Sequence, residues 1–476
     1  MSDFGKLPVE NVVDILARLS VTSLGQCRCV CKSWRSLIAD PIFINEQLSI
    51  NRDRRRIDGD HHHYSYITYS NIKGSNYVFS YSSSYHSLRC SETCREHKQI
   101  GYPWLIGICT VPSSCNGILC LLHRHQISFG YDIIIWNPLI KKIKILPKPR
   151  FQTSPNIDKS VAIGFVPQAN EYKVVHLNLA RNWEVSSPQK IEIYSLRKDS
   201  WRTWTGEDIQ WRLLGDTANE SVNGSIYWKA RKNVYNGDSR LIVSFHLADE
   251  VFKEISLPKY HRAHPNREVG FISVSIIYEK LAFSIARGSD SPNEEQVLEV
   301  WLLEESYGTE SWTKFRNIIF PTGQYKVPSF SFSTSEIYDV PSRLIENNVP
   351  TRFIENGEFS VHDSWNNRLI VLDPKTQRIV AKYGSKLKVV NCTESLVLLN
   401  EGIDISSREM WKFAREFAIQ KREEYRKMKE EEEERRKEED RKKKEVEVEE
   451  EELGIAGRVI KEVMEFFQEL WDQLMS

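Results

Sequence analysis

The first forty residues place apolar side chains at the period of an α-helix, with charged residues on the opposite face. Pro8 and Glu10 suit a first helical turn, where a missing amide costs nothing and the helix dipole favours an acid. The apolar positions that follow at intervals of three or four are Val9, Val12, Val13, Leu16 and Leu19. This pattern predicts an amphipathic helix that buries one face.

Two further short helices are expected before residue 41. Ser23 can cap a second helix, whose apolar positions are Leu24, Cys27 and Cys31. A third helix contains Trp34, Leu37 and Ile38, and it should end at Asp40-Pro41, because a residue before proline avoids the α region. Three short helices bury little area alone, so this module is expected to need a partner.

From about residue 64 to residue 400, short β-branched and aromatic runs alternate with turn residues, which predicts many antiparallel strands. One unit, a strand, a polar turn and a second strand, recurs five times. Its comparable positions are Trp136, Tyr194, Phe245, Trp301 and Leu372, at intervals of 58, 51, 56 and 71 residues. Such intervals suit four-stranded propeller blades with long loops, so about six blades are expected.

A second recurring element precedes several of these units. Its clearest copies begin with Asn116-Gly117 and Asn223-Gly224, and a weaker copy spans 394–399. An Asn-Gly pair readily adopts the positive φ angles that a tight hairpin turn requires. The pairs therefore predict tight hairpins at two equivalent places.

The end of the chain has a different composition. Between residues 421 and 452, 28 of 32 residues are charged, 12 basic and 16 acidic. Acids often precede bases by four positions, which supports a solvated helix, and apolar a and d positions are missing there. Beyond it an apolar stripe at helical spacing, with Trp471 beside it, predicts an amphipathic helix; its members are Val459, Ile460, Val463, Phe466, Phe467, Leu470 and Leu474. The stripe could pack on the β domain, a second copy or a partner; membrane docking is disfavoured by its acidic polar face.

Composition narrows the class of protein. The 476 residues are 40% hydrophobic and carry 65 basic and 65 acidic side chains, so a packed core is expected and nucleic acid is not the expected partner. Acidic residues interrupt residues 1–19, unlike a secretory signal, and no apolar run approaches a membrane span. Nine scattered cysteines favour reduced thiols. These features together indicate an intracellular protein, in the nucleus or the cytoplasm.

The N-terminal motifs resemble an F-box of the plant type. The residues that carry the resemblance are Leu7-Pro8, Ile15 to Leu19, Ser23-Leu24, Arg28 to Arg35 and Asp40 to Phe43. The resemblance implies docking onto a Skp-class adaptor, and through it onto a cullin-RING ubiquitin ligase. The positions that it assigns to adaptor contact are Leu7, Pro8, Ile15, Leu16, Leu19, Val30 and Trp34. Ser20, Gly25 and Cys27 depart from the family pattern.

The middle of the chain is similar to the F-box-associated, kelch-related domain that follows plant F-boxes. The similarity rests on Cys115 to Gly117, Trp136-Asn137-Pro138, Gly164-Phe165 and Tyr172 to Val175. The expected organisation is an all-α F-box over 1–48, a linker with first strands over 49–100, an all-β propeller over 101–402 and a charged helical tail over 403–476.

The sequence offers only weak evidence for a metal site or a catalytic site. The groups considered are His61 to His63, the set Cys90, Cys94 and His97, and the set Cys120, His123 and His125. None has the spacing of a known zinc site, and no phosphate loop or hydrolase motif occurs. No catalytic residue, metal or cofactor is therefore predicted. The basic residues Arg52 and Arg54 to Arg56 fit either a nuclear signal or a solvated linker after the helices, and the linker is the expected interpretation.

The expected function is target recognition for a ubiquitin ligase, with no chemistry performed by the chain itself. The F-box would bind the adaptor and the propeller would bind an unidentified target protein. Two alternatives stay open: an interaction scaffold whose F-box has decayed, and a propeller enzyme.

Overall fold

The computed structural model divides into two compact units, Met1–Met410 and Trp411–Ser476, which are described separately. The residues that it describes are 7–57, 64–73, 81–90, 96–99, 108–124, 131–151, 157–180, 190–213, 221–234, 237–258, 272–277, 280–287, 296–306, 309–320, 352–353, 359–363, 368–373, 378–385, 388–392, 394–400, 402–404 and 408–475.

The N-terminal module begins with three short helices, as predicted: α1 (Val9–Ala17), α2 (Val21–Cys27) and α3 (Lys32–Ile38). The cap of α2 differs from the prediction. Ser20, not Ser23, is the N-cap residue, and its hydroxyl accepts a hydrogen bond from the Ser23 amide at 3.2 Å. The prediction was wrong because two serines lie within one turn of the helix start, and either can serve as a cap. Cys31 is not part of α2 but caps α3.

A fourth helix, α4 (Pro41–Ile57), was not predicted. Asp40-Pro41 ends α3 as expected, and it also starts the next helix: the Asp40 carboxylate accepts a hydrogen bond from the Ile42 amide at 2.7 Å. Proline at the first position of a helix loses no hydrogen bond. Residues 49–57, which include the basic residues assigned to a linker, thus continue this helix.

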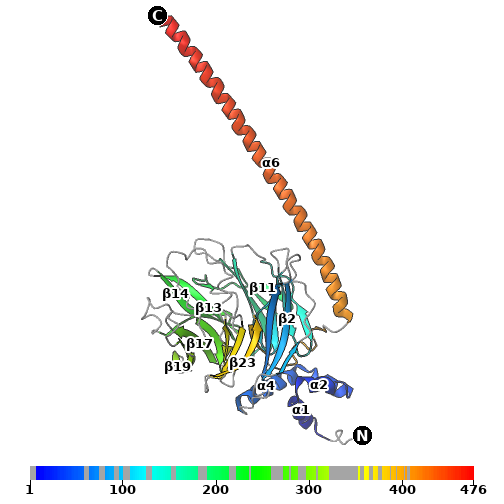
Figure 1. Cartoon of the computed structure of the whole chain (residues 1–476). Coiled ribbons are helices and arrows are strands. Elements are labelled where there is room, and N and C mark those ends of the chain that lie inside the picture. The colour runs from blue at the N-terminus through cyan, green and yellow to red at the C-terminus, as the bar shows by residue number, and fades with distance from the viewer. Residues whose placement is uncertain are drawn as a thin grey trace. The chain divides into compact units, whose positions relative to one another are not determined.

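The described strands of the β-rich region form six sheets. Figure 1 shows several of them side by side. Five of them follow the chain, and their strands are β4 (Ile108–Cys115), β5 (Ile118–Arg124), β6 (Tyr131–Asn137) and β7 (Lys142–Ile145); β8 (Ile157–Val166), β9 (Glu171–Ala180), β10 (Lys190–Ser195) and β11 (Ser200–Thr203); β12 (Arg212–Leu213), β13 (Ser225–Val234), β14 (Gly237–His246) and β15 (Val251–Ser256); β16 (Ile272–Ile277), β17 (Lys280–Arg287), β18 (Gln296–Ser306) and β19 (Thr309–Phe320); β20 (Arg352–Phe353), β21 (Phe359–Asp363), β22 (Arg368–Asp373) and β23 (Arg378–Ser385). A further strand, β25 (Ile403–Asp404), pairs with β7.

The sixth sheet joins the two ends of the β region. It contains β1 (Tyr64–Lys73), β2 (Tyr81–Cys90) and β3 (Glu96–Gln99), and β24 (Lys388–Cys392) pairs with β1 in the antiparallel sense. A strand from the end of the β region thereby completes a sheet from its beginning. This closure is the device by which a propeller removes long free edges.

The repeat read from the sequence corresponds to one strand of each sheet. Its five comparable positions lie on β6, β10, β14, β18 and β22, the third strands of five successive sheets. The turn that follows carries a residue with positive φ five positions later in three of them: Lys141, Asp199 and Glu250. Asn116-Gly117 and Asn223-Gly224 have positive φ as predicted.

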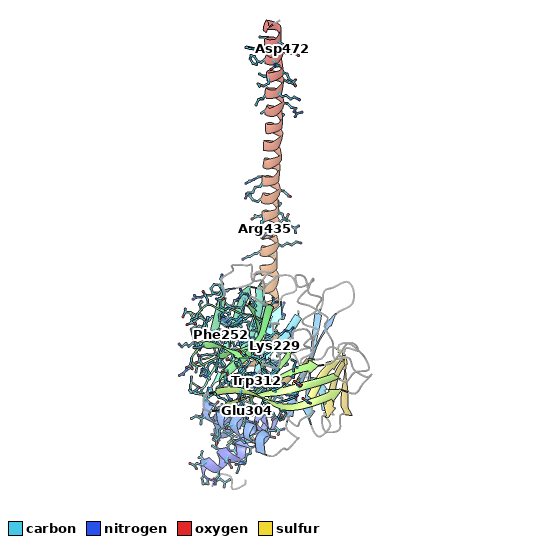
Figure 2. All side chains as sticks on the ribbon, turned by 90° about the vertical axis from the view of Figure 1, so that its left-hand side faces the viewer. Lys229, Phe252, Glu304, Trp312, Arg435 and Asp472 are labelled. Atoms are coloured by element: carbon cyan, nitrogen blue, oxygen red, sulfur yellow. The ribbon has the colours of Figure 1, made fainter. Side chains whose placement is uncertain are left out.

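The main hydrophobic core lies between neighbouring sheets. One cluster joins residues of β8–β11 to residues of β12–β15, with Trp228 and Phe245 fully buried. Phe252 (Figure 2) packs between these sheets, with its ring centroid 4.6 Å from that of Phe245 and 5.1 Å from that of Trp204. Gly164 lies in the same interface, where a Cβ atom would clash with Leu247 and lie 2.8 Å from the Ser221 hydroxyl.

The second unit consists of nearly all of α6 (Arg408–Met475), one continuous helix of 68 residues (Figure 1). Its charged side chains, such as Arg435 and Asp472, project from the helix (Figure 2). Acid–base pairs four positions apart were predicted for this segment, and one of them, Glu433–Lys437, is present at 3.4 Å. Among the helices of the described residues, none carries an apolar stretch long enough to cross a lipid bilayer.

Candidate functional site

The F-box helices leave several large apolar side chains on their surface. Leu7 is 40% exposed, Ile15 is 45% exposed and Val30 is 66% exposed. Val9 and Ile42, which were not among the predicted contact residues, are 67% and 77% exposed. Because exposed leucine, valine and isoleucine side chains gain free energy when water is removed from them, such a surface is typical of a protein-binding site.

The other predicted contact residues take different positions. Pro8 is exposed as the N-cap residue of α1. Leu16 is buried in the core of the helical module, and Leu19 and Trp34 pack against that core while keeping part of their surface exposed. Helical spacing identifies the apolar face, but it does not separate residues that hold the helices together from residues that face a partner.

The helical module is attached to the β region by residues 394–400. The Glu394 carboxylate accepts a hydrogen bond from the amide of Val21, the first residue of α2, at 3.2 Å. At the other end of this segment, the Asn400 amide donates to the carbonyl of Ala39, the C-cap residue of α3, at 2.7 Å. Polar groups at helix ends lack partners within the helix, so the β region supplies them.

Leucine side chains complete this joint. Leu396 and Leu399 are buried in the same cluster as Leu16, Leu24 and Phe43 of the helices. The segment that follows β24 therefore contributes two side chains to the core of the helical module.

Asn137 ties the joint to the sheets. Its side-chain amide donates to the carbonyls of Ser395 at 3.0 Å and Val397 at 2.9 Å, and its side-chain carbonyl accepts from the Leu139 amide at 3.1 Å. The Ser395 hydroxyl donates to the Asn116 carbonyl at 2.6 Å. The Asn-Gly and Trp-Asn-Pro motifs of the sequence thus meet at one place, which their separation along the chain does not indicate.

Ion pairs connect successive sheets in a repeated arrangement. A base on the fourth strand of one sheet pairs with an acid at or next to the last turn of the following sheet. The pairs are Lys144–Asp199 at 3.2 Å, Arg202–Glu250 and Lys253–Glu310 at 2.6 Å. Partial exposure limits the free energy that each pair contributes.

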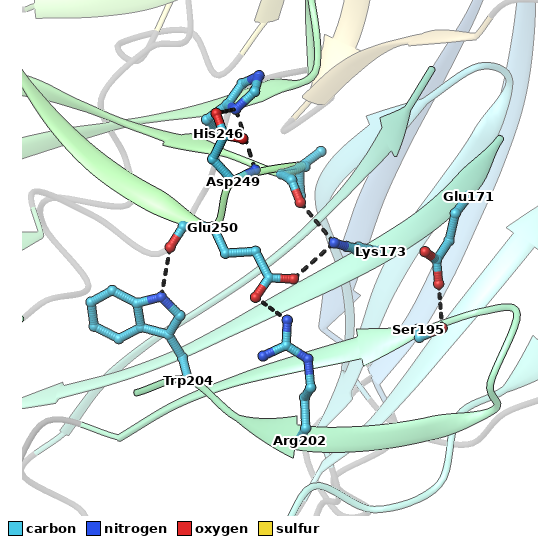
Figure 3. A network of polar contacts seen from close by, with 9 residues as sticks. Glu171, Lys173, Ser195, Arg202, Trp204, His246, Asp249 and Glu250 are labelled. Carbon is cyan, nitrogen blue, oxygen red and sulfur yellow. Dashed lines mark hydrogen bonds and ion pairs between the residues drawn. The ribbon is translucent and has the colours of Figure 1, made fainter. Parts of the chain in front are cut away.

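Glu250 takes part in several such contacts at once (Figure 3). Besides Arg202, its carboxylate accepts from the Lys173 ammonium at 2.8 Å, and its carbonyl accepts from the Trp204 indole at 2.8 Å. Lys173 also donates to the Leu247 carbonyl at 2.8 Å. Burial lowers the pKa of Lys173, opposed by the nearby Glu171 carboxylate and reinforced by Arg202. The network joins the β8–β11 sheet to the turn between β14 and β15 of the next sheet.

A buried polar triad joins the β8–β11 sheet, which holds His176 and Glu192, to Tyr131 of β6 in the preceding sheet. The Tyr131 hydroxyl is hydrogen-bonded to His176, whose other ring nitrogen lies 3.2 Å from the Glu192 carboxylate. Glu192 also accepts from the amides of Arg150 at 2.9 Å and Phe151 at 3.3 Å. Burial raises the pKa of Glu192, but the hydrogen bonds from His176 and the two amides outweigh it, and the net shift is downward. No sequence motif identified these residues in advance, because Glu192 and His176 occur singly in strands of otherwise typical β-strand composition.

The candidate metal groups receive no support from the described residues. Within the described ranges, no group of three or more His, Cys, Asp or Glu side chains converges on a common point. Cys120 is buried, and the ring of His123 lies 3.7 Å from the Asp132 carboxylate. His61 to His63, Cys94 and His125 lie outside the described residues, as do the side chains of Cys90 and His97.

Two family models match the chain. Residues 4–48 match an F-box-like domain, and residues 76–349, more than half of the chain, match the F-box associated beta propeller domain.

Curated relatives from Arabidopsis thaliana agree with these matches. An F-box/kelch-repeat protein is 28% identical over 257 residues, which are 53% of this chain and 65% of the relative. Two proteins that carry F-box names are 26% identical over 274 residues (55% of this chain, 63% of the relative) and 27% identical over 406 residues (79% and 81%). The chain spans a little under two thirds of the length of the first of these relatives. It belongs to the F-box proteins with an F-box-associated β-propeller domain.

Proposed function

We propose that this chain is the substrate-recognition subunit of a Skp-cullin-F-box ubiquitin ligase. The F-box helices would bind a Skp-class adaptor, which links them to a cullin-RING ligase in the nucleus or cytoplasm. The propeller would bind the target protein. The chain would perform no chemistry, and its contribution would be to raise the effective concentration of target lysines near the conjugating enzyme.

The observation that carries this proposal is the exposed apolar surface of a module whose sequence matches an F-box. Leu7, Pro8, Ile15 and Val30 are exposed, so their side chains are available for direct contact with an adaptor. Leu19 and Trp34 are partly exposed and would contact the adaptor with the part of their surface that the core does not cover. Leu16 would act by holding α1 in place. Val9 and Ile42 extend the same kind of surface.

Adaptor binding by the full chain tests the proposal directly. The variant Ile15→Asp/Val30→Asp places two charges on exposed positions, so it should fold normally and lose binding to a Skp-class adaptor in a pull-down or by calorimetry. Substituting Leu16 would be a poorer test, because a charge in the core would unfold the module.

The matched control is Gln26→Asp/Ser36→Asp, which adds the same charge at exposed polar positions of α2 and α3. Adaptor binding that survives in this control and disappears in Ile15→Asp/Val30→Asp supports the proposal. Absence of binding by the unaltered chain, or binding that the apolar-surface variant leaves unchanged, would refute it.

A further inference from the structure

The last part of α6 exposes a continuous apolar face. All residues from 454 to 472 are exposed in this chain. They include large side chains that rarely face water in such numbers: Ile455, Val459, Ile460, Val463, Met464, Phe466, Phe467, Leu470 and Trp471. Phe466 and Phe467 alone are 59% and 61% exposed. A patch of this kind marks a surface that is covered in the working state of the protein.

The spacing of these residues is that of a coiled coil. Ala456, Ile460, Val463, Phe467 and Leu470 are separated by steps of four, three, four and three residues, the alternation of a and d positions. A helix that packs on an irregular groove has no need for this alternation. Helices that pack along each other through a seam do, because the repeat of 3.5 residues keeps the seam facing its partner.

The charges of the segment are placed so that a second copy is not repelled. With Ile460 at an a position, the e and g positions that flank the seam between residues 457 and 471 are Gly457, Val459, Met464, Phe466 and Trp471, all uncharged. The charged residues take the outer b, c and f positions, and two of them, Lys461 and Glu465, pair with each other within the helix at 3.8 Å. The seam is therefore self-complementary: it is apolar across its whole width, with its charges turned away.

The preceding part of the helix sets the limit of the seam. Residues 421–452 are almost entirely charged, and Glu449 and Lys442 occupy the d positions that continue the register toward the N-terminus. Like charges facing each other across a seam destabilise it, so association is confined to the apolar end.

We propose that residues 455–471 pack against the same segment of a second copy of this chain, so that the protein self-associates through its C-terminal helix. Self-association would bring two propellers and two F-boxes into one particle. A target with two binding sites would then be held more tightly than by one chain.

Light scattering of the full chain after size-exclusion chromatography tests this proposal. The unaltered protein should have at least twice the mass of one chain. The variant Ile460→Asp/Phe467→Asp should have the mass of one chain, because it places two like charges in the seam. Since both positions are exposed in the single helix, circular dichroism should show that the helix is retained.

The control variant Lys461→Gln/Gln468→Asp changes the net charge by the same two units on the outer face, and it should associate like the unaltered chain. A chain that has the mass of one copy at every concentration would overturn the proposal; the apolar face would then be covered by the propeller or by another protein. Association that persists in Ile460→Asp/Phe467→Asp would also overturn it, because the contact would then lie elsewhere.

Discussion

Lys229 lies half-buried on β13 (Figure 2). Burial lowers the pKa of Lys229 from 10.5 to about 8, and the positive charge of Arg240 acts in the same direction. Arg240 lies diagonally across on β14, two residues from Ile242, the register partner of Lys229. A pKa difference of one unit corresponds to about 1.4 kcal/mol, so the charged form is disfavoured in the fold by about 3 kcal/mol.

The variant Lys229→Met should therefore be more stable than the unaltered chain at pH 7, by up to about 3 kcal/mol. Methionine keeps the length of the side chain and removes the charge. The gain should depend on pH. Below pH 8 Lys229 is charged in the folded and the unfolded state, so the full free-energy cost of burying the charge is present. Between about pH 8 and 10.5 the folded state loses the proton that the unfolded state still holds. The stability of the unaltered chain then rises toward that of the variant.

Urea unfolding of the propeller, followed by tryptophan fluorescence at pH 7 and pH 10, measures both quantities. Other groups titrate over this range, but they cancel in the difference between the two proteins. The control is Lys232→Met on the same strand: Lys232 pairs with Glu254 at 3.0 Å on the surface, so its removal should change the free energy of unfolding by less than about 1 kcal/mol. No gain from Lys229→Met at pH 7, or a gain of equal size at pH 10, would refute the reasoning.

Three further predictions concern the packing of the first unit. Glu192→Gln should destabilise the propeller at pH 7 by about 1–3 kcal/mol and make its stability depend less on pH in the acid range. The lowered pKa of Glu192 stabilises the fold at pH values above the usual glutamate pKa, and this contribution is lost as the pH falls through the pKa of the folded state. Thermal melts between pH 3 and 7 should show the difference, and identical pH profiles of the two proteins would contradict it. Gly164→Val should cost about 1–3 kcal/mol, because its side chain would collide with Leu247 and Ser221; an unchanged melting temperature would show that the interface can yield. Gln47→Met should stabilise the F-box module by about 1–3 kcal/mol, since the Gln47 amide is completely buried and finds no hydrogen-bond partner in the described part of the chain; a loss of stability in chemical unfolding would point to a bound water instead.

Local signals in the sequence identified most of the architecture. In three of the sheets the apolar or β-branched third strand is followed by a turn residue at a fixed distance, so the repeat can be recognised within a window of about ten residues. The pairing of β24 with β1 cannot be recognised in this way, because it joins segments more than 300 residues apart and neither strand has a distinctive composition. Helix α4 was missed for a different reason: its second half is strongly basic, and the burial of Phe43 in the core of the module, which stabilises the helix, is a tertiary contact that local sequence does not reveal.

The site was predicted less completely than the fold. The resemblance assigned Leu16 and Ile15 to the same role, although one is buried and the other is 45% exposed. The two residues are apolar and adjacent. The sequence does not show which of them lies at the centre of the buried face of the helix and which lies at its edge. The buried Glu192 was overlooked because an acidic residue in a strand is ordinarily solvated; only the fold brings His176 and two amides to its carboxylate.

The joint at residues 394–400 bears on how the proposed ligase subunit would work. Positioning a target lysine near a conjugating enzyme requires that the F-box and the propeller keep a constant orientation, since a free hinge would spread the target over a large volume. The segment that caps α2 and α3 directly follows β24, the strand that closes the ring, and it is held by Asn137 from the next sheet. Closure of the propeller and attachment of the F-box therefore depend on one short stretch of chain. The polar contacts of this stretch are directional and its leucines are buried in the F-box core, so it resists bending. An exposed linker lacks such contacts and would bend freely.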